Sequence, residues 1–180
     1  KLNKSLLLLS RIENGQYTEM EDVSVDEILD ELLPDLMDIY EHKQVRLIRK
    51  REEQPFIIRC NHSLAQILVS NLVKNSLLHN REGGELQVFT TPASLVIRNT
   101  GDAPLDGEKL FRRFYHGMDG KKDSTGLGLA IARSIALSSS LKLTYEWQDG
   151  MHTFRLVKVK FTVNCGYSQI FPNSLPLFAV

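Results

Sequence analysis

Apolar residues near the N-terminus recur at intervals of three and four positions, the spacing of one helical face. A first stretch of this kind ends at the helix-terminating pair Asn14-Gly15, and its apolar positions are Leu2, Leu6, Leu9 and Ile12. A second stretch begins at Ser24, where a capping serine is followed three positions later by Glu27, and continues to about His42. Pro34 lies inside this second predicted helix and removes a backbone hydrogen bond, so we expect a kink or a break there.

The middle of the chain alternates between strand and helix patterns. Short β-branched and aromatic runs predict strands over 45–49 and 56–59. Asn61 is a suitable cap for a long helix that continues to His79, and Gly83-Gly84 ends it.

Two β-hairpins are predicted in the second half. The first pairs 85–90 with 94–99, and the second pairs 141–147 with 152–163 through the strong turn signal Asp149-Gly150.

A long loop over 100–125 and a helix from Gly126 to about Ser139 lie between the hairpins. A loop of that length inside a compact domain usually has a function. The order of elements predicts an α+β fold in which a helical layer covers one face of a largely antiparallel sheet.

The composition is that of an ordinary globular chain. Its 180 residues are 42% hydrophobic and 24% charged, which argues against disorder and against collagen. Twenty-two Lys and Arg balance twenty-two Asp and Glu, so the overall positive field typical of nucleic-acid binders is lacking. Cys60 and Cys165 lie far apart, in neither a disulfide framework nor a zinc spacing.

No unbroken apolar run is longer than Leu6–Leu9, whereas a membrane-spanning helix needs about 20 apolar residues. The chain opens at Lys1, inside a predicted helix. We therefore expect a fragment of a longer protein, whose membrane anchor would lie upstream.

One candidate site is a polar stripe on the long middle helix. Asn71, Asn75 and His79 follow one another at four-residue steps, so a helix places them on one side. Asparagine oxygens are hard ligands suited to Mg²⁺, an ion that also binds substrate phosphates. A solvated helix face is the alternative, which the neighbouring Leu77 and Leu78 disfavour.

A second candidate site is the start of the last predicted helix. The segment 124–131 places Gly126 and Gly128 in the first turn, after a loop with Lys121 and Lys122. Glycines let a ligand approach the backbone, and free N–H groups with the positive dipole end attract phosphate. A glycine-rich helix entry needed only for packing is the alternative.

Two further segments are weaker signals alone. One is Asn99-Thr100-Gly101, which follows a predicted strand and by itself is a turn. The other is an aromatic island that by itself is a loop anchored in the core, flanked by solvated arginines; its members are Phe111, Arg112, Arg113, Phe114 and Tyr115.

In this order, the four pieces resemble the nucleotide-binding boxes of the sensor histidine kinase catalytic domain, in the superfamily shared with DNA gyrase B and Hsp90 ATPases. The resembling segments are 71–76 (N box), 99–101 (first glycine box), 110–115 (F box) and 125–129 (second glycine box).

The resemblance implies a Bergerat-type two-layer α/β sandwich, with a mixed, mostly antiparallel sheet and helices on one face. It covers roughly residues 22–163 as a catalytic ATP-binding domain. Residues 1–17 resemble the end of the second helix of the dimerisation and phosphoacceptor domain, and 164–180 remain an unassigned tail.

The resemblance also implies that ATP and Mg²⁺ bind between the N-box helix and a lid over 117–124. By that analogy Asn75 coordinates the metal, and Asn71 supports the metal and the phosphates as a catalytic residue. His79 would lie near the adenine or the ribose.

The glycine boxes would complete the site. Asn99 would hold the adenine amino group, with Gly101 in the same box and Thr125 assisting. Backbone N–H groups would hold the phosphates, from Gly126, Leu127, Gly128 and Leu129.

Several positions depart from the family pattern. Asn99 replaces an aspartate and loses its charge, which makes its hydrogen bonds weaker. Ala103 replaces a glycine and is followed by Pro104, while Leu78 and His116 replace a common lysine and a common arginine. Arg113, the second candidate catalytic residue, is expected to compensate, as are Lys121 and Lys122. We expect weaker ATP binding for these reasons.

The implied function is that of a protein-histidine kinase module of a two-component system, which transfers the ATP γ-phosphoryl group to a histidine for relay to a response-regulator aspartate. No histidine of this chain has the family's His-Glu-x-x-x-Pro context, so the phosphoacceptor is expected outside it. The implied partners are its own phosphoacceptor domain in a homodimer and a response regulator, at the cytoplasmic side of a bacterial inner membrane.

The same residues leave two alternatives. A degenerate module with weak or no kinase activity is favoured by the departures just named and opposed by the intact Asn71/Asn75 pair. A gyrase-like or Hsp90-like ATP hydrolase is disfavoured, because Asn71 occupies the position of the water-activating glutamate of those enzymes.

Overall fold

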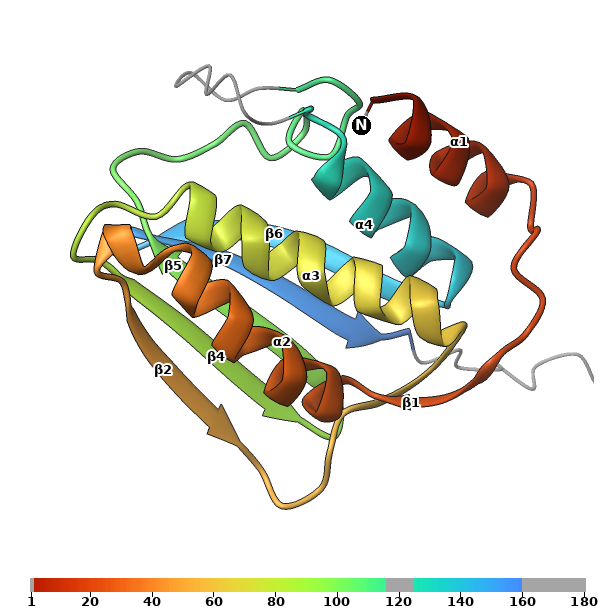
Figure 1. The fold of residues 1–180 in the computed structure, drawn as a ribbon, viewed down its shortest axis with the longest axis horizontal. Coiled ribbons are helices and arrows are strands. Elements are labelled where there is room, and N and C mark those ends of the chain that lie inside the picture. Colours follow the sequence, from red (N-terminus) through yellow and green to blue (C-terminus); the bar gives the residue numbers. More distant parts are fainter. Residues whose placement is uncertain (1, 116–124, 160–180) are drawn as a thin grey trace, which may run out of the picture.

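The computed structural model describes residues 2–115 and 125–159. Helices lie side by side over one face of a twisted sheet (Figure 1), in the order α2 (Val25–Ile39), α3 (His62–Leu78) and α4 (Gly128–Ser138). The N-terminal helix α1 (Leu2–Glu13) packs beside α4, and a short 3₁₀ turn, η1 (Glu41–Lys43), follows α2. The predicted helical layer is confirmed.

The main sheet has five strands in the described part of the chain. Their order is β2 (Arg46–Arg51), β4 (Glu85–Thr91), β5 (Ser94–Thr100), β7 (Met151–Lys158) and β6 (Leu141–Gln148). Only β2 and β4 run parallel, and the other neighbours are antiparallel. The mixed, mostly antiparallel sheet and both hairpins are therefore confirmed, although the expected end of the last strand, 160–163, lies outside the described residues.

A two-stranded ribbon at the edge of the domain was not expected. Strand β1 (Glu21–Ser24) pairs antiparallel with β3 (Ile57–Cys60), so β3 belongs to a different sheet from β2. Val23 is the one buried residue of β1. A strand this short with a single apolar position leaves no alternation for a sequence pattern to detect.

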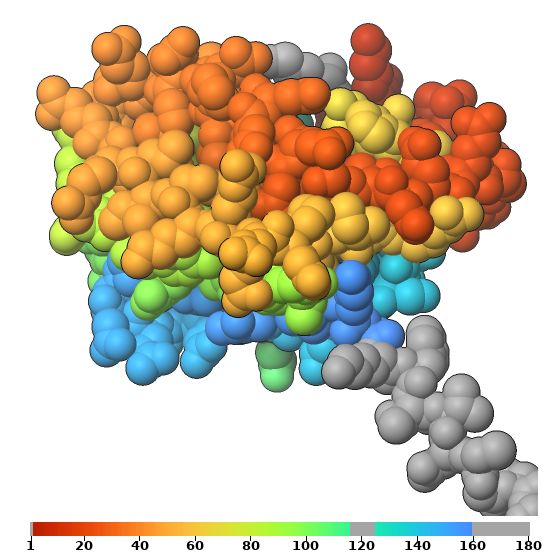
Figure 2. All heavy atoms as spheres, turned by 90° about the horizontal axis from the view of Figure 1, so that it is seen from below, coloured from red at the N-terminus to blue at the C-terminus, as the bar shows by residue number. Residues whose placement is uncertain are grey.

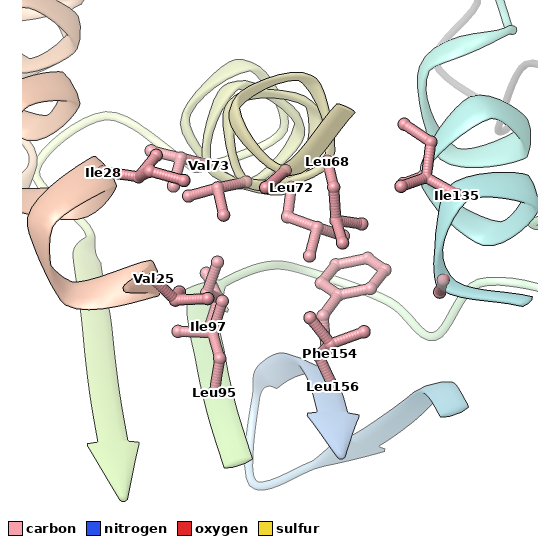
Figure 3. Close-up of a cluster of buried hydrophobic side chains, with 14 of the residues drawn as sticks. Val25, Ile28, Leu68, Leu72, Val73, Leu95, Ile97, Ile135, Phe154 and Leu156 are labelled. Carbon is pink, nitrogen blue, oxygen red and sulfur yellow. The ribbon is translucent and has the colours of Figure 1, made fainter. Parts of the chain in front are cut away.

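The core fills the space between the helical layer and the sheet. Figure 3 shows Leu68 and Leu72 of α3 facing Phe154 of β7, with Ile135 of α4 beside them. All four side chains are almost completely buried. Burial of each such side chain contributes roughly 1.5–3 kcal/mol, so α3 is fixed over the centre of the sheet.

The N-terminal cap of α2 is as predicted, and of the kink or break expected at Pro34 the break is not found. The Ser24 side chain accepts a hydrogen bond from the Glu27 N–H (3.3 Å). Pro34 lies within one continuous helix. The buried side chains of Leu29, Leu33 and Leu36 on both sides of it hold the two halves against the core, which offsets the missing backbone bond.

A buried ion pair ties α2 to the strands beneath it. The carboxylate of Asp26 pairs with the guanidinium of Arg49 on β2 and accepts hydrogen bonds from the Phe56 N–H (2.8 Å) and the Thr90 hydroxyl (2.5 Å). In Figure 2 the orange residues, which include β2, lie together on the side of the molecule where β2 forms the edge of the main sheet.

Candidate functional site

Helix α3 carries the predicted polar stripe. Its start is as expected, since the Asn61 side chain accepts a hydrogen bond from the Leu64 N–H (3.3 Å). Asn71, Asn75 and His79 are all half-buried, and His79 caps the C-terminus of the helix. The stripe is therefore partly covered rather than fully exposed to solvent.

The stripe and the second glycine box meet at one point. A Cβ atom built on Gly128 would lie 3.4 Å from Oδ1 of Asn71, and no side chain stands between them. Gly128 is the first residue of α4, which packs against α3. The predicted metal stripe and the predicted anion site are thus adjacent.

The second glycine box leads into α4, and neighbouring residues fix its backbone. Gly126 has a φ of +63°, a conformation that favours glycine, and its carbonyl accepts a hydrogen bond from the Phe114 N–H (2.9 Å). Leu127, the N-cap residue, is fully buried and offers no side-chain acceptor to the first N–H groups of α4. Thr125 is half-buried and Leu129 is buried beside them.

Asn99 of β5 has an unsatisfied acceptor in the described structure. Its side chain is 1% exposed and shares a sheet face with Leu95 and Ile97, toward the helices. Its Nδ2 donates to the Thr100 carbonyl (3.1 Å), while its Oδ1 is buried without a hydrogen-bond partner. Such an atom costs about 1–3 kcal/mol unless a donor reaches it, so the site is suited to a ligand N–H group.

Gly101 lies against a residue that the sequence patterns did not single out. A Cβ atom at this position would lie 2.2 Å from Nε2 of His152, so only glycine fits while the histidine keeps its place. The Gly101 N–H also donates to the Gly150 carbonyl (3.1 Å), which joins the first glycine box to the β6–β7 turn. The Asp149-Gly150 signal predicts the hairpin itself, but neither its bond to Gly101 nor the buried ring.

The C-terminal end of α3 faces the segment after the first glycine box. His79, Asn80 and Asp102 line a common cavity of about 400 Å³. The same end of the helix is capped by Lys43, whose Nζ donates to three carbonyls, those of Leu77 (2.9 Å), Leu78 (2.5 Å) and Asn80 (3.0 Å). The middle of α3 therefore meets the second glycine box at Asn71, and its C-terminal end meets the segment after the first.

Arg113 lies at a different surface. Its guanidinium pairs with the carboxylate of Glu13 at the end of α1, and both side chains are about half exposed. Arg113 and Glu13 also line a groove between α1 and α4. The F-box arginine thus contacts the N-terminal helix.

Other predicted residues stand as follows. Leu78 is half-buried and brings no charge, and Ala103 and Pro104 are exposed. Lys121, Lys122 and His116, the lid 117–124 and the tail 164–180 lie outside the described residues. Within 2–115 and 125–159 there is no cluster of three or more His, Cys, Asp or Glu side chains arranged for a metal ion. No helix in the same ranges is long and apolar enough to span a membrane.

Comparison with known proteins identifies a family. The family model described as histidine kinase-, DNA gyrase B- and HSP90-like ATPase matches residues 61–163. The sensor histidine kinase RppB of Synechocystis sp. is 30% identical over 192 aligned positions, which cover 100% of this chain and 38% of RppB. The sensor histidine kinase HprS of Escherichia coli is 25% identical, over 87% of this chain and 35% of HprS.

Solved structures have the same fold. The mycobacterial sensor histidine kinase MprB matches with a TM-score of 0.66 and 20% identity, over 78% of this chain and 97% of that structure. The cytoplasmic segment of histidine kinase QseC matches with a TM-score of 0.67 and 12% identity, over 88% and 89% respectively. The α+β architecture is therefore shared with histidine kinase catalytic regions.

Proposed function

The chain belongs to the family of histidine kinase-, DNA gyrase B- and HSP90-like ATPases, as an ATP-binding catalytic module homologous to those of sensor histidine kinases, and from this premise we propose how it acts. It binds ATP with Mg²⁺ between α3 and the N-terminus of α4. It delivers the γ-phosphoryl group to a histidine on another part of the protein, for relay to a response-regulator aspartate.

The contact of Asn71 with Gly128 is the observation that carries this proposal. It brings a hard oxygen ligand within van der Waals distance of the position at which a helix N-terminus begins. A metal ion at the stripe and an anion at the amides of 126–129 would then be neighbours, as in a metal–phosphate complex.

The nucleotide base is assigned to the first glycine box. The unpaired Oδ1 of Asn99 needs a donor, and the exocyclic amino group of adenine is one. Because Nδ2 is already bound to the Thr100 carbonyl, the amide presents its oxygen rather than its nitrogen. Thr125 would assist at the base, and His79, on the wall shared with Asp102, would lie near the base or ribose.

Asn75 is assigned as the metal ligand, with Asn71 supporting the metal and the phosphates. When bound, Mg²⁺ would neutralise charge on the phosphoryl group during transfer. The protein's own contribution is positioning: α3 is fixed over the sheet by Leu68 and Leu72, so both asparagines are held without a change of fold. Arg113 keeps its candidate phosphate role only if its pairing with Glu13 opens.

The chain spans 38% of RppB and 35% of HprS, so the remaining parts and partners of the whole protein belong to the proposal. We place the ATP-binding domain at 22–163 and the end of a dimerisation helix at 1–17. The module would work on the cytoplasmic side of a membrane sensor, in a homodimer with its own phosphoacceptor domain and with a response regulator.

Calorimetric titration with ATP tests the proposal directly. We expect binding that requires Mg²⁺ and that Asn75→Ala weakens at least about tenfold, since loss of metal-site partners commonly costs that much. Asn3→Ala, an exposed asparagine in α1, is the matched control and should leave binding unchanged. Lack of binding at millimolar ATP would favour the degenerate module, and binding indifferent to Asn75→Ala would remove the metal assignment.

A further inference from the structure

A buried histidine lies beneath the first glycine box. His152 of β7 is 5% exposed and is the direct cross-strand neighbour of Asn99. Its ring is packed against the indole of Trp147, with ring centroids 4.6 Å apart, and its Nε2 fills the space next to Gly101. The ring therefore packs against the chain at the end of β5, where the first glycine box begins.

A hydrogen-bond relay connects this ring to the loop that follows the glycine box. The Leu105 N–H donates to the hydroxyl of Tyr145 (2.9 Å), and that hydroxyl lies 2.9 Å from Nδ1 of His152. Besides accepting from Leu105, the hydroxyl can donate its own proton to Nδ1 or accept one from it, and the histidine tautomer decides which. The relay thus joins the loop at Leu105 to strands β6 and β7.

We propose that Tyr145 and His152 are positioning residues for nucleotide binding: together they fix the backbone from Gly101 to Leu105 and, through it, the placement of Asn99. The proposal rests on the proposed function of the site. Gly101 is held at one end of the segment by the ring and by the Gly150 carbonyl, and Leu105 is held at the other end by the tyrosine hydroxyl. The segment between these two anchors includes Asp102, which faces His79 across the cavity.

Protonation of His152 would change the relay. Burial lowers the pKa of His152 below 6.5, and the nearby charge of Asp102 raises it in part. Burial raises the pKa of Tyr145, so its hydroxyl stays protonated, and Trp147 does not titrate. Protonation would put a hydrogen on both ring nitrogens, so the tyrosine hydroxyl would have to turn its own proton away from Nδ1, and it would place a charge on a ring that is 5% exposed. Nucleotide affinity should therefore fall as the pH drops through the lowered pKa of His152.

Tyr145→Phe removes the relay and keeps the ring against Phe154. We expect ATP to bind about three- to tenfold more weakly, the usual effect of one hydrogen bond, and the Leu105 amide to exchange its hydrogen faster. Tyr17→Phe, a half-buried tyrosine away from the site, is the control and should change neither quantity. Unchanged ATP affinity in Tyr145→Phe, with or without faster exchange at Leu105, overturns the proposal.

His152→Asn separates positioning from packing. The asparagine oxygen can accept the tyrosine proton in place of Nδ1 but cannot be protonated, so we expect affinity near that of the wild type at pH 7.5 and a smaller loss on acidification to pH 5.5. Because the nucleotide phosphates also titrate near pH 6, the ratio of variant to wild-type affinity at each pH is the readout. An identical pH profile overturns the proposal. A wild-type chain that binds no ATP overturns the proposed function as well, whereas normal wild-type binding with unaffected variants overturns this inference alone.

Discussion

The amide oxygen of Asn71 lies 3.4 Å from the point that a Cβ atom on Gly128 would occupy, so α3 and α4 meet there with only backbone on the α4 side. A distance of 3.4 Å is an ordinary van der Waals contact. An alanine therefore fits at this position in the free protein, while its methyl group would occupy the space next to the amides at the helix start.

Gly128→Ala should separate stability from ligand binding. Replacing glycine within a helix by alanine stabilises by roughly 0.5–1 kcal/mol, and nothing in the contact with Asn71 opposes it. We expect a slightly higher free energy of unfolding in urea together with weaker ATP binding by calorimetry. Gly15→Ala, at a φ of +63° beyond α1, is the contrasting variant and should lower stability without affecting ATP. Undiminished ATP affinity in Gly128→Ala would place the phosphates elsewhere.

Asn99→Leu tests the unpaired oxygen. The two side chains have similar shapes. The variant loses the hydrogen bond from Nδ2 to the Thr100 carbonyl, but it also removes the buried Oδ1 that has no hydrogen-bond partner. These effects nearly cancel, and the free energy of unfolding should change by less than about 1 kcal/mol. ATP affinity should fall at least about tenfold, because the base loses its acceptor. A large loss of stability with normal ATP binding would show that the amide is structural only.

The sequence predicted the helices, hairpins and caps because each has a local cause, such as the Ser24 cap or the Asp149-Gly150 turn. It also placed the polar stripe on a helix, but it started the last helix at Gly126, two residues before its first residue, Gly128, and Gly126 has a φ of +63° outside the helix. It could not predict that Gly101 packs against His152, or that Arg113 pairs with Glu13, because these partners are brought together only by the sheet register and by the packing of α1 on α4. Strand β1 was missed because pairing with β3, rather than its own pattern, makes it a strand.

Arg113→Ala tests whether the F-box arginine serves α1 or the nucleotide. Because its partner Glu13 and the arginine are both about half exposed, we expect a coupling of only about 0.2–1 kcal/mol in a double-mutant cycle with Glu13→Ala. ATP affinity should stay within about twofold of the wild type, since the guanidinium is engaged at α1. A loss of tenfold or more in Arg113→Ala, absent in Glu13→Ala, would support the phosphate role.

Lys43→Met tests the cap of the N-box helix. The ammonium group satisfies carbonyls at the end of α3 and places a positive charge at the negative end of the helix dipole. Its loss should lower the free energy of unfolding by about 1–2 kcal/mol and increase amide exchange around 77–80. Lys4→Met, an exposed lysine in α1, should change stability by less than about 0.5 kcal/mol. Equal stability of the two variants would show that the cap contributes nothing.

Asp26→Ala tests the buried ion pair that fastens α2 to the strands. Burial alone would raise the pKa of Asp26, but hydrogen bonds from Thr90, the Phe56 N–H and Arg49, together with the arginine charge, hold it below 3.8. The unfolded chain therefore binds the proton first, so this contribution to stability is complete above pH 3.8 and is lost as the pH falls below it.

Removing one partner of a buried pair commonly costs about 3–5 kcal/mol, because the other charge is left without compensation. We expect a loss of that size for Asp26→Ala in urea unfolding at pH 7, and less than about 0.5 kcal/mol for Asp38→Ala, which is exposed on the same helix. Between pH 5 and pH 3 the wild type should lose stability more steeply than Asp26→Ala. Parallel curves for the two proteins would show that the carboxylate does not titrate with a lowered pKa in the folded state.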